Sequence, residues 1–573
     1  MKRKWIILWG LAAWIFLLVT AGIAQGRIIY VDDDANGLND GTSWQNAYNY
    51  LQDALADANS SPKPIEIRVA QGIYRPDQTS AEPNGSGDRT ATFQLINGVT
   101  LKGGYAGLGQ PDPNERDISK NETILSGHLN GTDNYHVVTG SGTDANAVID
   151  GFTITGGYDG GMYNDHGSPT VTNCIFSRNW GRDGGCVYNY YGNPIFVNCM
   201  FREGRGCTGG GIYNRYSNPM LTDCTFSENV AYGGEYCNFF GGGGMCNWLS
   251  SPMLTNCTFR RNSAGGFGRG TGGGMLNYHS NVTLVQCTFT ENSGKLCGGM
   301  CNGDGSTAKL TDCTFSKNSG YSGGGIYNGA IYSEMYNGQS TLTLNNCIFN
   351  KNSAMDGGGM YNISDSVTVI NCIFIGNLAY ASGNEYGYGG GMYTYALGGN
   401  ATIINCRFSQ NLAKDSGGGM YAIGFSTVTN CIFSGNSAVE YGGGICCRPG
   451  RLTLANCTFA GNSAKNGKAL ICDGGFISIV EVQGNNCILW DGGDEIFRRG
   501  SSKVDVAYSD IQGGWSGEGN IDKDPCFAEP GYWDPNGTPD DANDDFWVGG
   551  DYHLKSQAGR WDANEGRCYK SLH

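Results

Sequence analysis

The chain has 573 residues, of which 16% are charged, and its formal net charge is −15 at pH 7. A sparse and acidic charge argues against nucleic acid as a partner. Glycine occurs 94 times and cysteine 23 times, and both recur at regular intervals, which excludes a low-complexity chain and indicates repeats.

Residues 1–24 have the pattern of a secretory signal peptide. A basic run at 2–4 precedes an apolar run from Ile6 to Val19, and small residues at 22–24 suit cleavage. The apolar run is short for a membrane anchor. We therefore expect an exported protein, secreted or held at the cell surface, with no transmembrane segment after signal cleavage.

Residues 25–92 are predicted to form an N-terminal cap. A strand at 28–31 precedes the acidic run Asp32–Asp34, and a helix is expected from Thr42 or Ser43 to about Asn59. The open end of a solenoid needs a cover with a polar outer face. The helix suits that role because its apolar residues have helical spacing: Trp44, Tyr48, Leu51, Leu55 and Ala58. Residues 65–69 then alternate as the first rung.

Residues 93–490 form the body of the chain, with regular repeats from about residue 157. Each copy has glycines, an apolar residue, usually Tyr-Asn, and a β-rich run that ends in Cys-x-Phe-x-x-Asn. An apolar residue lies three positions before the cysteine in the first eleven copies. Strand side chains alternate with period two, so this odd offset requires a corner, and Asn, Asp or Gln precedes every cysteine. The cysteines are Cys174, Cys199, Cys224, Cys257, Cys287, Cys313, Cys347, Cys372, Cys406, Cys431, Cys457 and Cys487.

Three short strands per period, without helical spacing, predict an all-β, right-handed parallel β-helix. Its coils would stack about 4.8 Å apart, and like residues would form ladders. The Asn that closes each Phe-x-x-Asn is expected to form an internal hydrogen-bonded ladder. Four insertions lengthen the repeat. The first three leave the same corner and the fourth follows the third strand: residues 230–241, 263–271, 378–388 and 329–342.

The paired signature Gly-Gly-x-[Ile/Met] and Phe-x-x-Asn resembles the repeats of the polymorphic outer membrane proteins over roughly residues 150–490. That family comprises secreted right-handed β-helices on bacterial surfaces, so the resemblance implies a pectin-lyase-like fold and a binding, adhesive or structural role. The run Asp505–Phe527 resembles the closing segment of bacterial secreted β-helix proteins. Residues 491–573 are expected to be irregular coils and a tail, truncated or diverged at RCYKSLH.

The enzymatic alternative is a polysaccharide lyase or glycoside hydrolase of the pectate-lyase-like superfamily. Such enzymes need a carboxylate cluster with a basic residue nearby on an outer sheet face. The outward positions beside the cysteines are Thr, Ile, Ser or Arg in most copies, and His128 and Asp165–His166 are isolated titratable groups. We therefore expect no catalytic residues.

A tyrosine follows the inward residue of many coils and is the candidate for ligand binding. Stacked rings can bind the sugars of a polysaccharide or cell-surface glycan, while the phenols and the Asn that usually follows hydrogen-bond sugar hydroxyls. The alternative is that the rings only stack along the rod and stabilise it. The candidates, termed the tyrosine column, are Tyr163, Tyr188, Tyr213, Tyr327, Tyr361, Tyr393 and Tyr421.

Calcium is the candidate cofactor. Residues 534–545 place oxygen ligands at alternating spacing around a glycine, which suits the coordination of this ion. The alternative is a solvated acidic loop, and Asp32–Asp34 is a weaker candidate site. The ligands would be Asp534, Asn536, Asp540, Asp541, Asn543 and Asp545.

The twelve repeat cysteines are expected to stay reduced inside the rod. Parallel stacking holds their Cβ atoms about 4.8 Å apart, beyond the usual disulfide reach of about 3.5–4.5 Å. Two other pairs are disulfide candidates. Cys447 and Cys472 occupy the same position in adjacent coils at the corner end of a strand, and Cys526 with Cys568 is the second pair.

Overall fold

The computed structural model describes residues 26–573 except 129–132, 234–240, 266–269, 332–339, 365, 382–385, 475–479, 537–545, 556–559, 563–566 and 570–573. The predicted signal peptide therefore lies outside the described residues. In the described part of the chain, no helix combines the length and the apolar character that a bilayer crossing demands.

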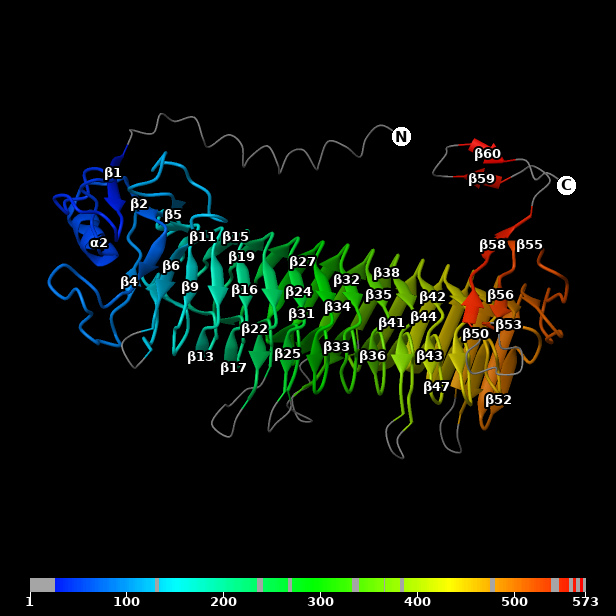
Figure 1. Ribbon diagram of the computed structural model, residues 1–573. Helices are drawn as coiled ribbons and strands as arrows, with labels where there is room; N and C mark the ends of the chain where they lie inside the picture. Colours follow the sequence, from blue (N-terminus) through cyan, green and yellow to red (C-terminus); the bar gives the residue numbers. More distant parts are fainter. Residues whose placement is uncertain are drawn as a thin grey trace.

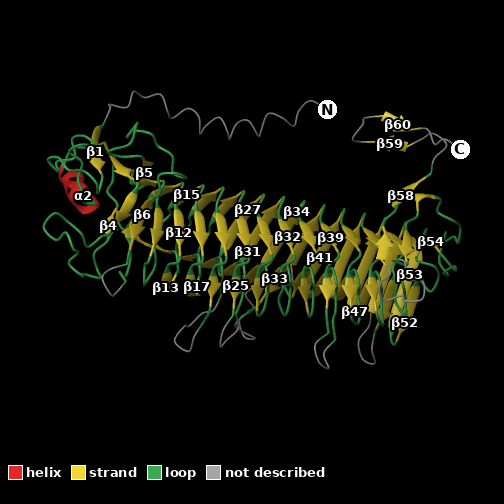
Figure 2. Cartoon of the chain, viewed as in Figure 1, coloured by secondary structure: helices red, strands yellow, loops and turns green. Residues whose placement is uncertain are grey.

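The described chain winds into a long rod of stacked parallel coils (Figure 1). A 29-stranded sheet and a 16-stranded sheet run along the rod, and a third face carries one five-stranded and one four-stranded sheet. Strands make up almost all of the regular structure, and the helix stands at the N-terminal end (Figure 2). The predicted all-β right-handed parallel β-helix is confirmed.

One coil shows how the repeat folds. β18 (Ile212–Arg215) and β19 (Met220–Thr222) lie in the 29-stranded sheet, β20 (Thr225–Ser227) in the 16-stranded sheet, and β21 (Val230–Ala231) on the third face. The strand after the glycines and the strand before the cysteine thus share one sheet, which the sequence did not reveal. In later coils the two fuse, as in β41 (Met392–Ile404).

The predicted corner before each cysteine is confirmed. Asp223 precedes Cys224 with a φ of 55°, and the residue before every repeat cysteine is left-handed in the same way, from Asn173 to Asn486. Short amide and carboxylate side chains tolerate this conformation better than most. The corner turns the chain from the first sheet to the second, so the apolar residue before it and the phenylalanine after it both face inward.

Two ladders fill the core beside the cysteines. The phenylalanines from Phe176 to Phe459 are fully buried, and successive ring centroids lie 4.5–5.2 Å apart. The predicted asparagine ladder is also present. From Asn229 to Asn462, each Nδ2 donates to the Oδ1 of the next asparagine at 2.9–3.0 Å. Each buried amide therefore has its partner in the adjacent coil.

The glycine runs have a steric cause. Gly417 opens its run with a φ of 72°, which favours glycine. A Cβ on Gly419, two residues later, would lie 2.6 Å from the carbonyl oxygen of Gly444 and 2.9 Å from the Phe433 ring. The run thus brings the backbone of one coil against the core of the next.

The cap helix is shorter than predicted. α2 (Leu51–Ser60) buries Leu51, Ala54, Leu55 and Ala58 over the first strands, whereas residues 42–50 form turns and a bridge. Trp44 packs edge-on against Tyr30, and Tyr48 forms a parallel bridge with Val31. The apolar residues of the two stretches share a helical spacing by coincidence, because the first two of them serve the sheet.

The C-terminal end folds back on the rod. The last rung contains β53 (Ser502–Ala507) and β54 (Asp510–Ile511), and the hairpin of β56 (Tyr532–Asp534) and β57 (Phe546–Val548) follows. Trp547 of this hairpin lies where a Cβ on Gly435 or Gly461 would be. These two corner glycines make room for the indole.

Candidate ligand-binding groove

The third face of the rod carries a groove made of two adjoining hollows. Its short strands are β13 (Trp180–Asp183), β17 (Arg205–Thr208), β21, β25 (Ser263–Ala264) and β29 (Ser293–Gly294), paired in parallel. The hollows have volumes of about 550 and 590 Å³ and share Val230. We call them together the third-face groove.

The first hollow is lined mainly by charged side chains. Arg178 donates to Glu203 at 2.7 Å, and this hydrogen bond lowers the pKa of the Glu203 carboxyl. Glu228 lies 3.9 Å from Arg261, which belongs to the next coil. Arg205 is exposed at the rim. The hollow is lined by Arg178, Asn179, Trp180, Glu203, Arg205, Glu228 and Val230.

Aromatic rings gather at the outer end of this hollow. Trp180 is 36% exposed and lies 4.7 Å from the Tyr158 ring and 6.5 Å from the Tyr232 ring. Arg89 lies over Tyr158 at 5.0 Å and over Tyr135 at 4.6 Å. Tyr135 and Tyr158 are 41% and 47% exposed, so this aromatic group presents ring surface to solvent.

The second hollow has a floor of small residues between aromatic ends. Tyr232 stands at one end and Tyr321, which is 45% exposed, at the other, where the Tyr380 hydroxyl donates to the Gly320 carbonyl at 3.2 Å. The exposed Lys295 borders the floor. The lining residues are Val230, Tyr232, Ser263, Ala264, Gly265, Ser293, Gly294, Lys295, Ser319, Gly320, Tyr321 and Tyr380.

Tyr232 and Tyr321 lie three coils apart, because β21 pairs with β25, β25 with β29, and Ser293 bridges to Ser319. At about 4.8 Å per coil the floor is about 14 Å long. A shallow trough with rings at its ends and small polar residues between them has the shape and chemistry of a carbohydrate site.

The groove residues were not among the sequence predictions, although a signal for them exists. Tyr232, Tyr321 and Tyr380 each lie three positions after the asparagine that closes Phe-x-x-Asn. That position points outward on the third face. Three of the predicted insertions, 230–241, 263–271 and 378–388, begin with the short third-face strands β21, β25 and β40 (Leu378–Ala379). Reading that offset in every copy would have found the face.

The tyrosine column lies on the outside of the first sheet but is not open. Tyr213, Tyr327 and Tyr421 are only 5–6% exposed, and the other four are partly buried. Their rings cover one another. Tyr361 lies 5.5 Å from Tyr327 and 4.5 Å from Tyr393, which lies 5.1 Å from Tyr421. Burial raises the pKa of Tyr188 and of Tyr361 to about 12. This geometry favours stacking along the rod.

The asparagine that follows these tyrosines was expected to contact sugar hydroxyls, and that expectation is wrong. Asn164, Asn189 and Asn214 are fully buried and form a second internal ladder, with Nδ2 to Oδ1 distances of 2.7–2.8 Å. Strand alternation explains the outcome, because the residue after an outward tyrosine points inward.

The disulfide predictions differ from the structure. Cys447 and Cys472 are in register on β47 (Ile445–Ala455) and β49 (Leu470–Asp473), but both are buried free thiols. Their parallel stacking imposes the same separation that keeps the repeat cysteines apart. Cys526 is an exposed free thiol, and the Cys568 side chain lies outside the described part.

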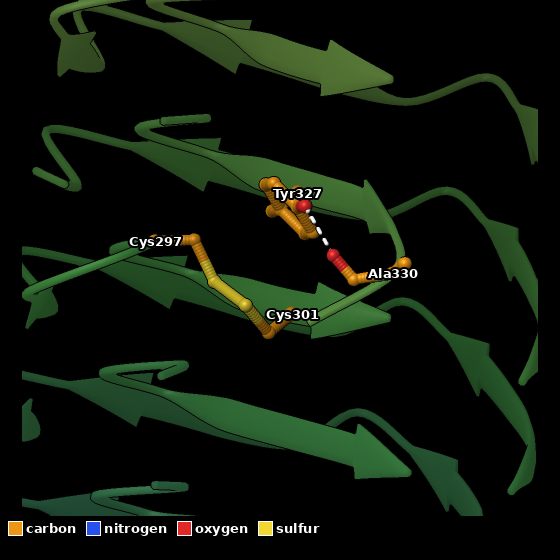
Figure 3. Close-up of a disulfide and its surroundings, with 4 residues drawn as sticks. All are labelled: Cys297, Cys301, Tyr327 and Ala330. Carbon is orange, nitrogen blue, oxygen red and sulfur yellow. Dashed lines mark hydrogen bonds between the residues drawn. A yellow bond between two sulfur atoms is a disulfide. The ribbon is translucent and has the colours of Figure 1, made fainter. Parts of the chain in front are cut away.

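A disulfide forms instead between Cys297 and Cys301 (Figure 3). Cys301 stands in register with Tyr327 of the column, and Cys297 precedes the glycines of the same coil. The Tyr327 hydroxyl donates to the Ala330 carbonyl at 2.6 Å. The Cys297–Cys301 disulfide thus joins two segments of one coil beside the tyrosine column.

The structure adds no support for the predicted calcium ligands or for a catalytic role of the titratable residues that it describes. Asp540, Asp541, Asn543 and Asp545 lie outside the described residues, and Asp534 accepts a hydrogen bond from the Asn536 backbone. The carboxylates of Asp32–Asp34 lie within 4.8 Å of one another, but Asp32 accepts hydrogen bonds from the backbone of Asp34 and Leu108. The His128 ring pairs with Asp133, and that of His166 with Asp165, both on the exposed surface.

Comparisons with known proteins agree with this architecture. The model of the right-handed beta helix region matches residues 120–265, 205–333 and 235–389, and that of the Chlamydia polymorphic membrane protein repeat matches residues 430–448. No curated protein matches the chain. The protein is a right-handed parallel β-helix. More particularly, it is one that carries a repeat of the polymorphic membrane protein type.

Solved structures resemble the chain weakly. A mannuronic acid specific polysaccharide family 6 lyase from human gut microbiota shares 10% identity over 80% of this chain and 86% of its own, with a TM-score of 0.36. PfbA, a surface adhesin of Streptococcus pneumoniae, shares 12% identity over 72% and 88%, with a TM-score of 0.25. Tailspike protein 3 of bacteriophage CBA120 shares 10% over 83% and 61%, with a TM-score of 0.27. At these values the likenesses carry no argument about function.

Proposed function

We propose that the protein binds a polysaccharide or cell-surface glycan in the third-face groove and does not cleave it. The observation that carries this proposal is the trough of about 590 Å³, floored by Ser, Ala and Gly and bordered by Tyr232, Tyr321 and Tyr380. Rings at the ends of such a trough stack on sugars, and the exposed Ser293 and Ser319 hydroxyls hydrogen-bond them.

The charges of the groove support binding rather than hydrolysis. A general acid needs a carboxyl pKa raised toward neutrality. Glu203 has the opposite property, because its hydrogen bond with Arg178 lowers its pKa. Glu228 faces Arg261. The groove therefore holds its carboxylates as ion pairs, and the lyase or hydrolase alternative gains no residue from it.

A glycan-array screen of the mature protein, followed by binding titration of any hit, tests the proposal. Tyr321→Ala with Tyr380→Ala should lower the affinity by about fivefold to a hundredfold, since each stacked ring contributes about 0.5–1.5 kcal/mol beyond its buried area. The matched control is Tyr361→Ala with Tyr393→Ala in the tyrosine column, which should leave affinity unchanged. Equal affinity in the groove variant and the parent would overturn the proposal, and so would accumulation of reducing or unsaturated sugar products.

We further propose that the protein acts outside the cytoplasm, secreted or on the cell surface. The basic and apolar pattern of residues 1–24 supports export. N-terminal sequencing of the protein recovered from culture medium and cell envelope should find a start near residue 25. An uncleaved chain recovered only from the cytoplasm would contradict export without affecting the groove.

A further inference from the structure

The cysteine ladder is a chemical feature that glycan binding leaves unused. Eleven of its thiols, from Cys199 to Cys487, stand on consecutive coils, and all are unbonded and at most 2% exposed. Neighbouring members of the row lie on paired coils, and each thiol donates to the carbonyl oxygen two residues before it, as Cys372 does to Ile370 at 3.2 Å. The row is therefore a continuous line of sulfur atoms.

Backbone contacts hold these sulfurs between the coils. The amide of Cys347 donates to the Cys372 sulfur at 3.4 Å, and the amide of Cys406 donates to the Cys431 sulfur at 3.3 Å. On the other side, the thiol of Cys347 donates to the Leu310 carbonyl of the preceding coil at 3.8 Å. Each sulfur is thus placed by its neighbouring coils and not by a flexible loop.

The spacing of the ladder suits one ion between two sulfurs. Coils repeat at about 4.7–4.9 Å. Two metal–thiolate bonds in line, each taken as about 2.3 Å as for zinc, span about 4.6 Å. The coil spacing that keeps the Cβ atoms of successive cysteines out of disulfide reach is therefore close to the span of a linear sulfur–metal–sulfur unit. Zinc does not fit, because it needs four ligands in a tetrahedron and each gap supplies two.

Charge balance selects a monovalent ion. All of these thiols are at most 2% exposed, and an isolated thiolate is unfavourable in so apolar a site. If every sulfur is shared by two monovalent ions, negative and positive charges alternate and the row stays neutral. Thiolate ligands select soft ions such as Cu(I).

We propose that the row from Cys199 to Cys487 binds soft monovalent metal ions of the Cu(I) and Ag(I) class, one between each pair of successive sulfurs. Ten ions fill the ten gaps and ten thiol protons leave for solvent, so one terminal thiol keeps its proton. Sulfur is neither oxidised nor reduced. Since the thiols are sealed from solvent, the ions enter when coils open locally, and loading is slow.

Silver(I) is the probe, because it is not oxidised by air. The full chain is held with excess Ag(I) below its melting temperature and freed of loose metal by gel filtration, and bound silver is counted by native mass spectrometry. Wild type should retain ten ladder ions with two sulfur neighbours each by X-ray absorption. Cys347→Ala with Cys372→Ala and Cys406→Ala interrupts four gaps and should retain six.

The matched control removes three free cysteines outside the row, Cys246, Cys446 and Cys526, and should keep all ten two-sulfur ions. The Cys347→Ser, Cys372→Ser and Cys406→Ser variant keeps near-native side-chain size and should also lose four ions, which separates metal binding from misfolding. The proposal is overturned if the ladder variant loses three ions or fewer, if the control loses as many as the ladder variant, or if wild type retains no silver.

Discussion

Two rows of aromatic residues line the outside of the rod, and they differ in how much of each ring is exposed to solvent. In the tyrosine column, Tyr361 and Tyr393 stand on adjacent coils with ring centroids 4.5 Å apart, and Tyr421 is only 6% exposed. In the third-face groove, Gly265 and Lys295 separate Tyr232 from Tyr321, which is 45% exposed. The first row is a covered stack and the second an open trough.

The difference follows from one length. The strand spacing of about 4.8 Å is close to the distance at which aromatic rings stack. Rings on consecutive coils therefore cover one another and stabilise the rod, whereas rings separated by small residues keep a surface for a ligand. In a parallel β-helix, a gap in an aromatic row is thus the more informative sign of binding.

The largest expected effect is on the stability of the column. Tyr361→Ala with Tyr393→Ala should lower the free energy of unfolding by about 3 kcal/mol or more, since two stacked and largely buried rings are removed. Urea denaturation followed by circular dichroism measures it. The groove variant, Tyr321→Ala with Tyr380→Ala, should lose about 1 kcal/mol, the size of one hydrogen bond. Equal losses of unfolding free energy in the two variants would contradict the distinction between a covered column and an open groove.

Alkaline unfolding should report the covered state of the column. The pKa of Tyr361 is raised to about 12 by burial, while an unfolded tyrosine ionises near pH 10. Below about pH 10 the phenol is neutral in both states and the free energy of unfolding does not depend on it. As the pH rises from about 10 to 12, ionisation of the unfolded state lowers the free energy of unfolding by up to about 1.4 kcal/mol per pH unit. Tyr361→Phe should show a shallower decline in urea midpoints over that window. An unchanged decline would place the phenol in solvent.

The continuity of the groove can be tested at its first hollow. Trp180→Ala should weaken binding of a long oligosaccharide several-fold, because the lost stacking contact is worth about 1 kcal/mol. It should not affect an oligosaccharide short enough to fill only the floor between Tyr232 and Tyr321. Calorimetric titration with glycans of two lengths distinguishes the cases. The same loss for both lengths would mean that the two hollows are not one site.

The smallest effect comes from converting the groove into a column. Lys295→Tyr places a ring on the coil next to Tyr321, where the two should stack. We expect the free energy of unfolding to rise slightly, by less than about 1 kcal/mol. The glycan affinity should fall a few-fold, because the new ring occupies the floor. Lys295→Ala is the control for the lost charge. Stronger binding in the tyrosine variant would show that ring number matters more than ring exposure.

Much of the architecture was predictable because the repeat constrains it at every coil. The odd offset between the apolar residue and the cysteine required a corner, and the residue before each cysteine is left-handed as expected. The same reasoning failed at the N-terminal end of the rod, where the cap helix was predicted to be too long. Trp44 and Tyr48 fit a helical stripe, yet they serve the sheet, since a single cap has no repeated copies against which to check a period.

The binding surface was not predictable to the same degree. The tyrosine column was visible as a recurring residue, but its exposure depends on neighbouring rings and on side chains from other coils. By contrast, the inward direction of the asparagine after each outward tyrosine follows from strand alternation alone, and Asn214 is fully buried. The groove depends on Tyr232, Tyr321 and Tyr380, which come from coils far apart in the chain.

The sequence by itself determined the β-helix, its corners and its inward ladders, because a period of about 25 residues must repeat the same local geometry in every coil. Only the tertiary structure decided which outward rings are covered, which cysteines are joined, and where the rod is hollowed. Those properties depend on the contacts between coils and on the segments packed against them. The strand pattern can be read within one repeat, whereas the exposure of a surface residue depends on side chains from several coils.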